Sequence, residues 1–189
     1  MSHQASPPEG AGPAHPASAP GPAAFHAVLH EPEIPNNTGN AGRTCVALGA
    51  ALHLVHPLGF DLSEKAVRRA GLDYWPRLDL REHADWPAYR AAAAGARVWM
   101  LSTRGERLVY EAELRPEDHF VFGGESRGLP EAVLNSAPPG RVLRLPMRPG
   151  ERSLNLATSV AVVLYEAWRQ VWARGGDVPG AARRSAGGG

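Results

Sequence analysis

Short apolar runs alternate with helical patterns along most of this chain, and this alternation constrains the fold more than any other feature. Apolar runs that stop at glycine or proline predict buried strands. The predicted strands are 25–30, 52–56, 97–101, 119–123 and 142–145. The predicted helices are 38–51, 63–70, 86–94, 130–135 and 153–173. This order favours an α/β domain with a mostly parallel sheet and helices on both faces.

The two ends of the chain differ in composition from its middle. Residues 1–22 are mostly Pro, Ala, Gly and Ser, and residues 174–189 end in three glycines. Such segments bury too little apolar surface to offset the entropy lost on ordering. We therefore expect a disordered N-terminal extension (1–22), one domain (23–173) and a disordered C-terminal tail (174–189).

Several features favour a cytoplasmic protein. No apolar run is long enough to cross a bilayer, and the first residues lack the pattern of a secretory signal. The single cysteine, Cys45, falls on the apolar side of a predicted helix, where a small buried side chain is expected rather than a nucleophile. The eight histidines show no metal-ligand spacing, so no metal site is predicted.

Three polar loops stand beside apolar elements, at 36–43, 122–130 and 145–156. In α/β proteins such loops follow the carboxyl ends of strands, where ligands bind. Three of them in one short chain predict a single composite site.

The first loop admits two interpretations. Asn36 to Asn40 have the residue types of an ordinary helix cap. Arg43, about one turn after Gly39, instead favours an anion site, because helix N-termini attract anions and a guanidinium suits phosphate or a developing oxyanion. The pattern alone leaves both open.

The other two loops also have structural explanations. Glu125 is expected to accept hydrogen bonds from loop N–H groups or to pair with Arg127, rather than to act in acid–base chemistry. Ser153 can simply cap the last helix, with Asn155 in its first turn. A serine nucleophile is not supported, since no G-x-S-x-G turn is present.

Charge is balanced over the domain and uneven locally. Acidic and basic residues are equal in number between residues 23 and 172, which excludes a uniformly basic nucleic-acid binder. A local basic patch is still possible, because five arginines fall within one stretch: Arg127, Arg141, Arg144, Arg148 and Arg152.

The last predicted helix is apolar around most of its circumference. Residues 160–164 are apolar in succession, and Tyr165, Trp168, Val171 and Trp172 follow. A helix that packs only on its own core needs no more than an apolar stripe. We therefore expect a homodimer contact through this helix, in preference to a monomer with a deeply buried helix.

Taken in order, segments 31–43, 122–130 and 145–156 resemble the three motifs of the SPOUT class of RNA methyltransferases. The likeness extends to 57–60, 68–74 and 165–170, and within the class it points to the small single-domain branch that methylates the ribose 2′-hydroxyl at the tRNA wobble position. The familiar form of the motifs has proline where Asn36 and Gly124 stand, so local loop rigidity differs here.

The resemblance implies a fold and a cofactor that periodicity could not reveal. Members of the class form a deep C-terminal trefoil knot, a rare exception to unknotted chains. They bind S-adenosylmethionine in the knot, which by motif matching assigns cofactor contacts to Leu101, Gly123, Leu145 and Ser153. They dimerise through helices that include the last one.

The resemblance also implies roles for particular residues. Arg43, Ser153 and Asn155 are the expected catalytic residues, and Arg43, Arg127, Arg148 and Arg152 the expected RNA contacts. The expected substrate is the ribose of cytidine or uridine 34 in the tRNA anticodon loop, with no metal. The alternative within the class is a ribose elsewhere in tRNA or rRNA. Rivals outside it are a dinucleotide-dependent oxidoreductase, which the missing G-x-G-x-x-G disfavours, and a catalytically silent RNA-binding module.

Overall fold

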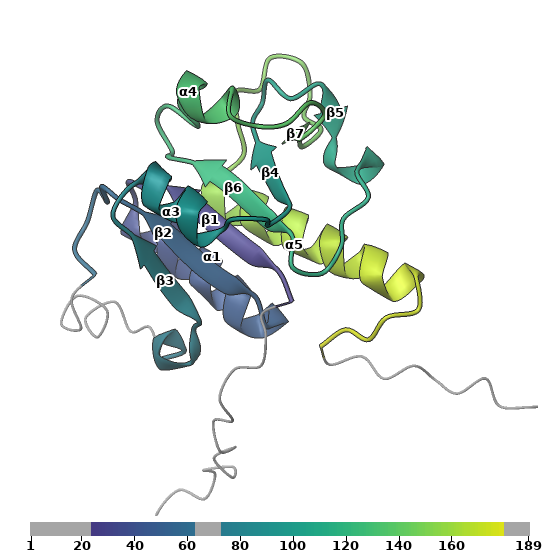
Figure 1. The fold of residues 1–189 in the computed structure, drawn as a ribbon, viewed down its shortest axis with the longest axis horizontal. Helices are drawn as coiled ribbons and strands as arrows, with labels where there is room; N and C mark the ends of the chain where they lie inside the picture. The colour runs from purple at the N-terminus through teal and green to yellow at the C-terminus, as the bar shows by residue number, and fades with distance from the viewer. Residues whose placement is uncertain (1–23, 63–72, 180–189) are drawn as a thin grey trace, which may run out of the picture.

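A computed structural model describes residues 24–62 and 73–179. Within these residues, seven parallel strands form one sheet in the order β3-β2-β1-β6-β4-β7-β5 (Figure 1). The strands are β1 (His26–His30), β2 (Ala51–Val55), β3 (Leu80–His83), β4 (Val98–Leu101), β5 (Arg107–Leu108), β6 (His119–Gly123) and β7 (Val142–Arg144). The predicted parallel sheet is confirmed.

Helices cover both faces of the sheet, also as predicted. The long helices α1 (Pro35–Leu48) and α5 (Leu156–Ala173) pack on one face, where they share the larger hydrophobic core with alternate strand residues such as Leu29 and Phe120. The short helices α3 (Trp86–Ala92) and α4 (Glu131–Leu134) contribute to a second core on the other face, around Val28 and Met100. Single turns of 3-10 helix occupy Trp75–Arg77 (η1) and Val109–Glu111 (η2).

The ends of three helices differ from the prediction. Helix α1 begins three residues earlier, at Pro35, because the fixed φ of proline suits the first helical position. Helix α5 begins at Leu156, because Asn155 and not Ser153 is its N-cap; the side chain of Asn155 accepts a hydrogen bond from the Thr158 N–H at 3.2 Å. Pro130 precedes α4 as its N-cap instead of starting it.

Two strands and two predicted segments complete the comparison. Strands β3 and β5, one at each edge of the sheet, were not predicted from the sequence. The predicted helix 63–70 and the N-terminal segment 1–22 lie outside the described residues. After α5 the described chain turns back, and Val178 packs against the larger core. No helix among the described residues is long and apolar enough to span a membrane.

Part of the apolar character of α5 is used within the monomer. The ring of Trp168 meets Phe25 edge-on, with the ring centroids 5.3 Å apart, and its indole N–H donates to the Leu48 carbonyl at 3.1 Å. By contrast, the side chain of Tyr165 is 59% exposed. One side of α5 is thus built into the core, and an aromatic residue marks its outer side.

Candidate functional site

The loop after β6 is hydrogen-bonded to the start of α1 through the carboxylate of Glu125. One carboxylate oxygen accepts the backbone N–H of Glu33 at 2.8 Å, and the other accepts the Ile34 N–H at 3.3 Å and the side-chain amide of Asn37 at 2.9 Å. The negative group at this helix N-terminus is therefore supplied by the protein itself, which suits the positive end of the helix dipole. The structural role predicted for Glu125 is confirmed: its carboxylate accepts from backbone N–H groups and from Asn37, and it forms no ion pair with Arg127.

The start of α5 joins the same cluster. The side-chain amide of Asn155 donates to the side-chain oxygen of Asn37 at 2.8 Å, while its own oxygen caps α5. Glu125, Asn37 and Asn155 therefore connect all three predicted loops, which lie far apart in the sequence. The predicted convergence of the loops is confirmed at these residues. Asn37 was not singled out from the sequence, because Asn in a capping segment has an ordinary explanation.

Glycine is required where the loop after β6 folds back on itself. A side chain at Gly123 would place its first carbon 2.0 Å from the Gly128 carbonyl carbon, and one at Gly124 would meet the Glu31 oxygen at 2.7 Å. Gly124 and Gly128 form an isolated antiparallel bridge, and the N–H of Gly128 donates to the Gly124 carbonyl at 2.9 Å. The Ser126 hydroxyl fastens the loop to the Glu33 carboxylate. Motif matching assigned a cofactor contact to Gly123; on the side where a side chain would lie, the structure shows the chain's own backbone.

Three of the four predicted cofactor residues lie at the carboxyl ends of neighbouring strands, and Ser153 is the exception. In β4, Leu101 is in register with Phe122 of β6 and with Leu143 of β7, so Gly123 and Leu145 follow directly on neighbouring strands. Leu101 and Leu145 are partly buried and pack against the larger core. Ser153 is exposed, three residues before the start of α5, and among the described residues it has no hydrogen bond to these strands.

Arg43 lies in the interior of α1, about 12 Å along the helix from Pro35 at 1.5 Å per residue. The predicted helix began at residue 38, which would place Arg43 about one and a half turns after its start; because α1 begins at Pro35, Arg43 instead lies about two turns inside the helix. Its guanidinium carbon is 4.5 Å from the centre of the Tyr74 ring, and Nη2 is 3.9 Å from the Asp73 carboxylate. Its side chain is 61% exposed. The described residues give no hydrogen bond or ion pair between Arg43 and Gly123, Leu145 or Ser153.

Tyr74 orients this part of α1. It is buried, and its hydroxyl donates to the Gly39 carbonyl at 2.5 Å. Burial raises the pKa of the Tyr74 hydroxyl, with the positive charge of Arg43 acting in the opposite direction. Tyr74 is therefore a neutral donor that carries a guanidinium on its ring face. This pairing could not be predicted from the sequence, since the two residues are far apart along the chain.

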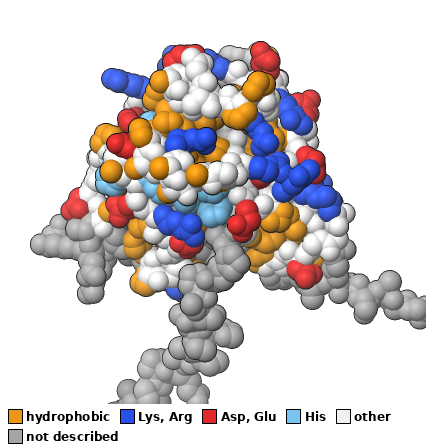
Figure 2. Space-filling model, in the orientation of Figure 1, with side chains coloured by type: hydrophobic (Ala, Val, Ile, Leu, Met, Phe, Trp, Pro, Cys, Tyr) orange, Lys and Arg blue, Asp and Glu red, His pale blue; other side chains and the backbone are white. Residues whose placement is uncertain are grey.

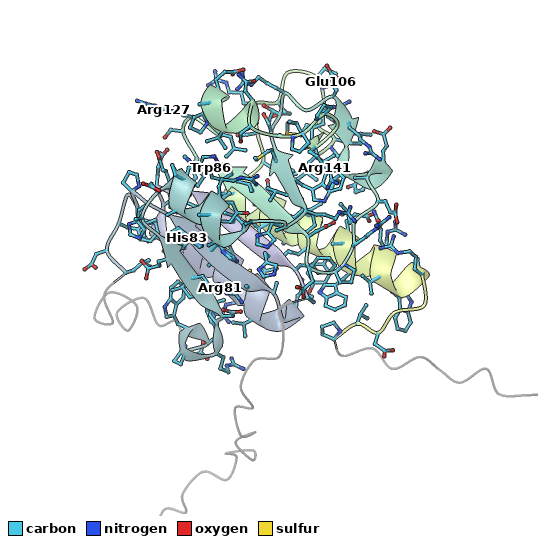
Figure 3. The ribbon with its side chains drawn as sticks, viewed as in Figure 1. Arg81, His83, Trp86, Glu106, Arg127 and Arg141 are labelled. Atoms are coloured by element: carbon cyan, nitrogen blue, oxygen red, sulfur yellow. The ribbon has the colours of Figure 1, made fainter. Side chains whose placement is uncertain are left out.

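Besides Arg43, three arginines are expected to meet RNA, and all three are exposed. Arg127 follows β6, and Arg148 and Arg152 lie in the loop before α5. None of the three has a carboxylate partner among the residues that the structure describes. Arg127 is labelled at the upper edge of the molecule in Figure 3, beyond the carboxyl end of β6. Their guanidinium groups are free of the acidic partners that the sequence allowed, Glu125 among them.

Four histidines form a cluster that the sequence did not reveal; three are buried and His83 is partly buried. They come from β1, β2, β3 and β6: His26, His53, His83 and His119. Nitrogens of the first two are 3.0 Å apart, those of His53 and His83 are 2.9 Å apart, and the Tyr89 hydroxyl is 3.0 Å from His119. Ligand atoms of His26, His53 and His119 all lie within 4.8 Å of one another.

A structural role accounts for this cluster better than a metal site. The rings of His26 and His119 are stacked 4.0 Å apart at an angle of 11°, so their in-plane lone pairs run side by side and do not converge on one point. Burial lowers the pKa of His53 to about 2 and that of His119 to about 3. Neutral imidazoles that bond to each other and to Tyr89 already satisfy their buried polar atoms. The cluster lies on the face covered by α3, away from the loops described above (His83 is labelled in Figure 3).

The chain is a member of the SpoU rRNA Methylase family, whose model matches residues 24–165. The names of its relatives are more specific than the name of the family. The tRNA (cytidine(34)-2'-O)-methyltransferase of Burkholderia pseudomallei (strain 1106a) is 51% identical over 154 residues, covering 80% of this chain and 99% of that protein. The protein of the same name from Escherichia coli (strain K12) is 42% identical over 157 residues, covering 83% and 97%. Membership of this family removes the oxidoreductase alternative.

Solved structures agree with the family. One that addresses "the 2-OH methylation of C/U34 on tRNA" is 53% identical, with a TM-score of 0.75, and covers 82% of this chain and 100% of that chain. An AdoMet-bound rRNA methyltransferase from Sinorhizobium meliloti is 25% identical, with a TM-score of 0.68, and covers 80% and 58%. The chain therefore has the fold of RNA methyltransferases over nearly all of its described residues.

Proposed function

We propose that this chain transfers a methyl group from S-adenosylmethionine to the ribose 2′-hydroxyl of cytidine or uridine 34 in tRNA. One observation carries the proposal: a solved structure that addresses this reaction is 53% identical to the chain and is covered along its whole length. The three-loop connection through Glu125, Asn37 and Asn155 supports it, because it joins the segments that resemble the motifs of such enzymes.

The cofactor would lie at the carboxyl ends of β4, β6 and β7. Leu101 and Leu145 are apolar but not fully buried, which fits a wall for an adenine ring. Gly123 and Ser153 would add backbone and hydroxyl contacts. S-adenosylmethionine supplies a methyl group on a positively charged sulfur whose leaving thioether is neutral, so we expect no metal in the reaction.

We also propose that the chain forms a C-terminal trefoil knot next to the carboxyl ends of these strands. Close backbone approaches support it. A side chain at Gly105 would place its first carbon 2.6 Å from the Leu143 carbonyl carbon, so the loop after β4 presses directly on β7. The segment that follows β7 would then pass through that loop on its way to α5.

Arg43 is the proposed catalytic residue. A guanidinium stays protonated in proteins, so we assign it to electrostatic stabilisation of the ribose oxygen as charge builds there, and to the neighbouring phosphate. The 2′-hydroxyl proton would pass to water or phosphate. Stacking on Tyr74 holds the Arg43 side chain while leaving much of it exposed to a substrate. Asn155 would align the loops, and Ser153 would contact the reactants beside it.

The anticodon loop of tRNA is the proposed partner of the exposed arginines Arg127, Arg148 and Arg152. Their lack of carboxylate partners among the described residues supports this, because nothing there competes with a phosphate. Homodimerisation through α5 is also proposed, with the exposed Tyr165 and the half-buried Ala161 and Val162 on the contacting side. A tRNA-modifying enzyme of this kind would work in the cytoplasm.

Site-resolved methyl transfer tests the proposed function. The purified chain would be incubated with labelled S-adenosylmethionine and a tRNA transcript, and the modified nucleotide would be mapped by mass spectrometry. The expected product carries one methyl group on the ribose of nucleotide 34. A matched transcript with 2′-deoxyribose at that nucleotide should accept none. Methylation of a base would contradict the proposal, and methylation of another tRNA or rRNA ribose would favour the alternative within the family.

A further inference from the structure

A cavity of about 390 Å³ opens at the end of the sheet opposite the proposed catalytic loops. Arg97, Asp118 and Arg141 directly precede β4, β6 and β7, so they mark the amino ends of strands whose carboxyl ends carry Leu101 and Gly123. The cavity is lined by Arg97, Trp99, Arg107, Glu113, Arg115, Pro139, Gly140 and Arg141. We call it the arginine pocket, after Arg97, Arg107, Arg115 and Arg141.

The arginine pocket holds more positive than negative charge. Arg115 pairs with Glu113 at 2.9 Å, and Arg97 pairs with the fully buried Asp118 at 3.2 Å. Among the described residues, Arg107 and Arg141 have no carboxylate partner. Figure 2 shows basic side chains gathered on the right-hand part of the visible face, where Figure 3 labels Arg141. Arg107 donates to the backbone carbonyl of Glu111, and the charge of Asp118 acts on Arg141 only from outside ion-pair distance.

Hydrogen-bonding capacity in the pocket is also unfilled. One terminal nitrogen of Arg97 and one of Arg141 are buried without an acceptor. The Arg141 guanidinium carbon is 4.2 Å from the centre of the Trp99 ring, so the group is held by stacking. Burial and the nearby charge of Arg97 lower the pKa of Arg141, which agrees with an excess of positive charge around it.

We infer that the arginine pocket binds a backbone phosphate of the RNA substrate, at a distance from the methylated ribose. This inference rests on the proposed function. Guanidinium groups match phosphate oxygens with two parallel N–H donors, and those held by stacking lose little freedom on binding. Strand β6 has five residues, so its two ends are about 15 Å apart at roughly 3.3 Å per residue. A folded RNA that reaches the catalytic loops is large enough to contact this end as well.

Salt-dependent binding of the full chain to unmodified tRNA tests the inference. Each phosphate contact adds roughly 0.7–0.9 to the slope of log affinity against log salt concentration. The Arg107→Gln/Arg141→Gln variant removes the one proposed phosphate contact, so it should lower the magnitude of that slope by about 0.7–0.9 and weaken binding at low salt about tenfold or more. The matched control, Arg81→Gln/Arg90→Gln, removes two exposed arginines on β3 and α3 and should keep the wild-type slope.

Two further variants separate binding from folding. Arg107→Gln alone leaves the Arg141–Trp99 stack intact and should lower the slope by less than the double variant does. Arg141→Lys keeps the charge and should restore most of the slope lost in Arg141→Gln. If the folded variants bind tRNA with the affinity and slope of the control, the inference is wrong. Binding of polyglutamate, an acidic polypeptide, would be measured in parallel. If the variants lose polyglutamate binding but bind tRNA normally, the pocket binds acidic polypeptides and the inference is wrong.

Failure of this inference can be distinguished from failure of the proposed function. Methylation of nucleotide 34 by a chain whose pocket variants bind tRNA normally would leave the proposed function standing and remove the phosphate site. Wild-type protein that binds tRNA through the pocket but never methylates nucleotide 34 would do the reverse.

Discussion

The side-chain amide of Asn155 donates to the side-chain oxygen of Asn37 across 2.8 Å, and this bond ties the start of α5 to the first turn of α1. The same Asn155 side chain caps α5. One residue therefore sets both where the last helix begins and how the loop before it meets α1. Because that loop carries Ser153 and Arg152, the geometry of the proposed site depends on this pair.

Two substitutions at Asn155 separate its two roles. Asn155→Asp keeps an oxygen that can cap α5 but loses the amide donor to Asn37, so we expect near-normal stability and lower turnover. Asn155→Ala loses both, and should also lower the free energy of unfolding by about 1–2 kcal/mol. Urea denaturation and methyl-transfer assays of both variants provide the measurement. Equal turnover in Asn155→Asp and wild type would show that the bond to Asn37 does not position the site.

Arg43→Lys tests the proposed catalytic role. Lysine keeps the charge but loses the planar fork and its stacking on Tyr74, so it cannot present the same donor to the ribose oxygen. One well-placed oxyanion donor contributes roughly a hundredfold or more in turnover. We expect a loss of that size, with tRNA affinity unchanged. Arg90→Lys, on α3, is the control for exchanging an exposed arginine, and a loss below about tenfold in Arg43→Lys would contradict the role.

Glu125→Gln tests the carboxylate that holds the start of α1. Both oxygens of Glu125 accept hydrogen bonds, and a glutamine amide would turn a donor toward a backbone N–H of Glu33 or Ile34. We expect a decrease of about 1–3 kcal/mol in the free energy of unfolding, since a partly buried donor loses its acceptor. Glu106→Gln, at an exposed position, should change stability by less than about 0.5 kcal/mol. Similar effects of the two changes in urea denaturation would contradict the assigned role.

The sequence predicted the buried strands of the sheet because they are continuous apolar runs. Strand β3 escaped prediction, since its residues Leu80–His83 are mostly polar and only partly buried at the sheet edge. Strand β5 has two residues, Arg107–Leu108, too few for any periodicity. Edge strands are held by hydrogen bonds to one neighbour, and their side chains need not be apolar.

Side-chain contacts between distant residues could not be predicted from the sequence for a different reason. The partner of Asn155 lies 118 residues away, and its identity depends on how α1 and α5 pack. The motif resemblance assigned a role to Asn155, but it gave none to Glu125, Asn37 or Tyr74, although all three lie in segments that carry it. Likewise, the four clustered histidines show no common spacing because different parallel strands bring them together. His26 and His119 are directly opposite in register, and His53 and His83 lie two and four residues further along on the neighbouring strands.

The buried histidines predict a stability that falls in acid. Burial lowers the pKa of His53 to about 2 and of His119 to about 3, from an ordinary value of 6.5. Between about pH 6.5 and 3 the unfolded chain therefore binds more protons than the folded chain. Stability should be level above about pH 7 and should decline as the pH falls through 6.5. Each histidine that stays neutral in the fold contributes up to about 1.4 kcal/mol per pH unit once it is fully protonated in the unfolded chain.

Two variants on the α3 face of the sheet isolate this effect. His119→Gln removes one such imidazole, so the slope of unfolding free energy against pH between 6 and 5 should fall by about 1 kcal/mol per pH unit. Tyr89→Phe removes the hydroxyl beside His119 but no imidazole, so it should lower stability at every pH and leave the slope close to that of the wild type. Urea denaturation across this pH range measures both. A wild-type slope in His119→Gln would mean that this ring takes up its proton in the folded chain, and the neutral cluster would have to be abandoned.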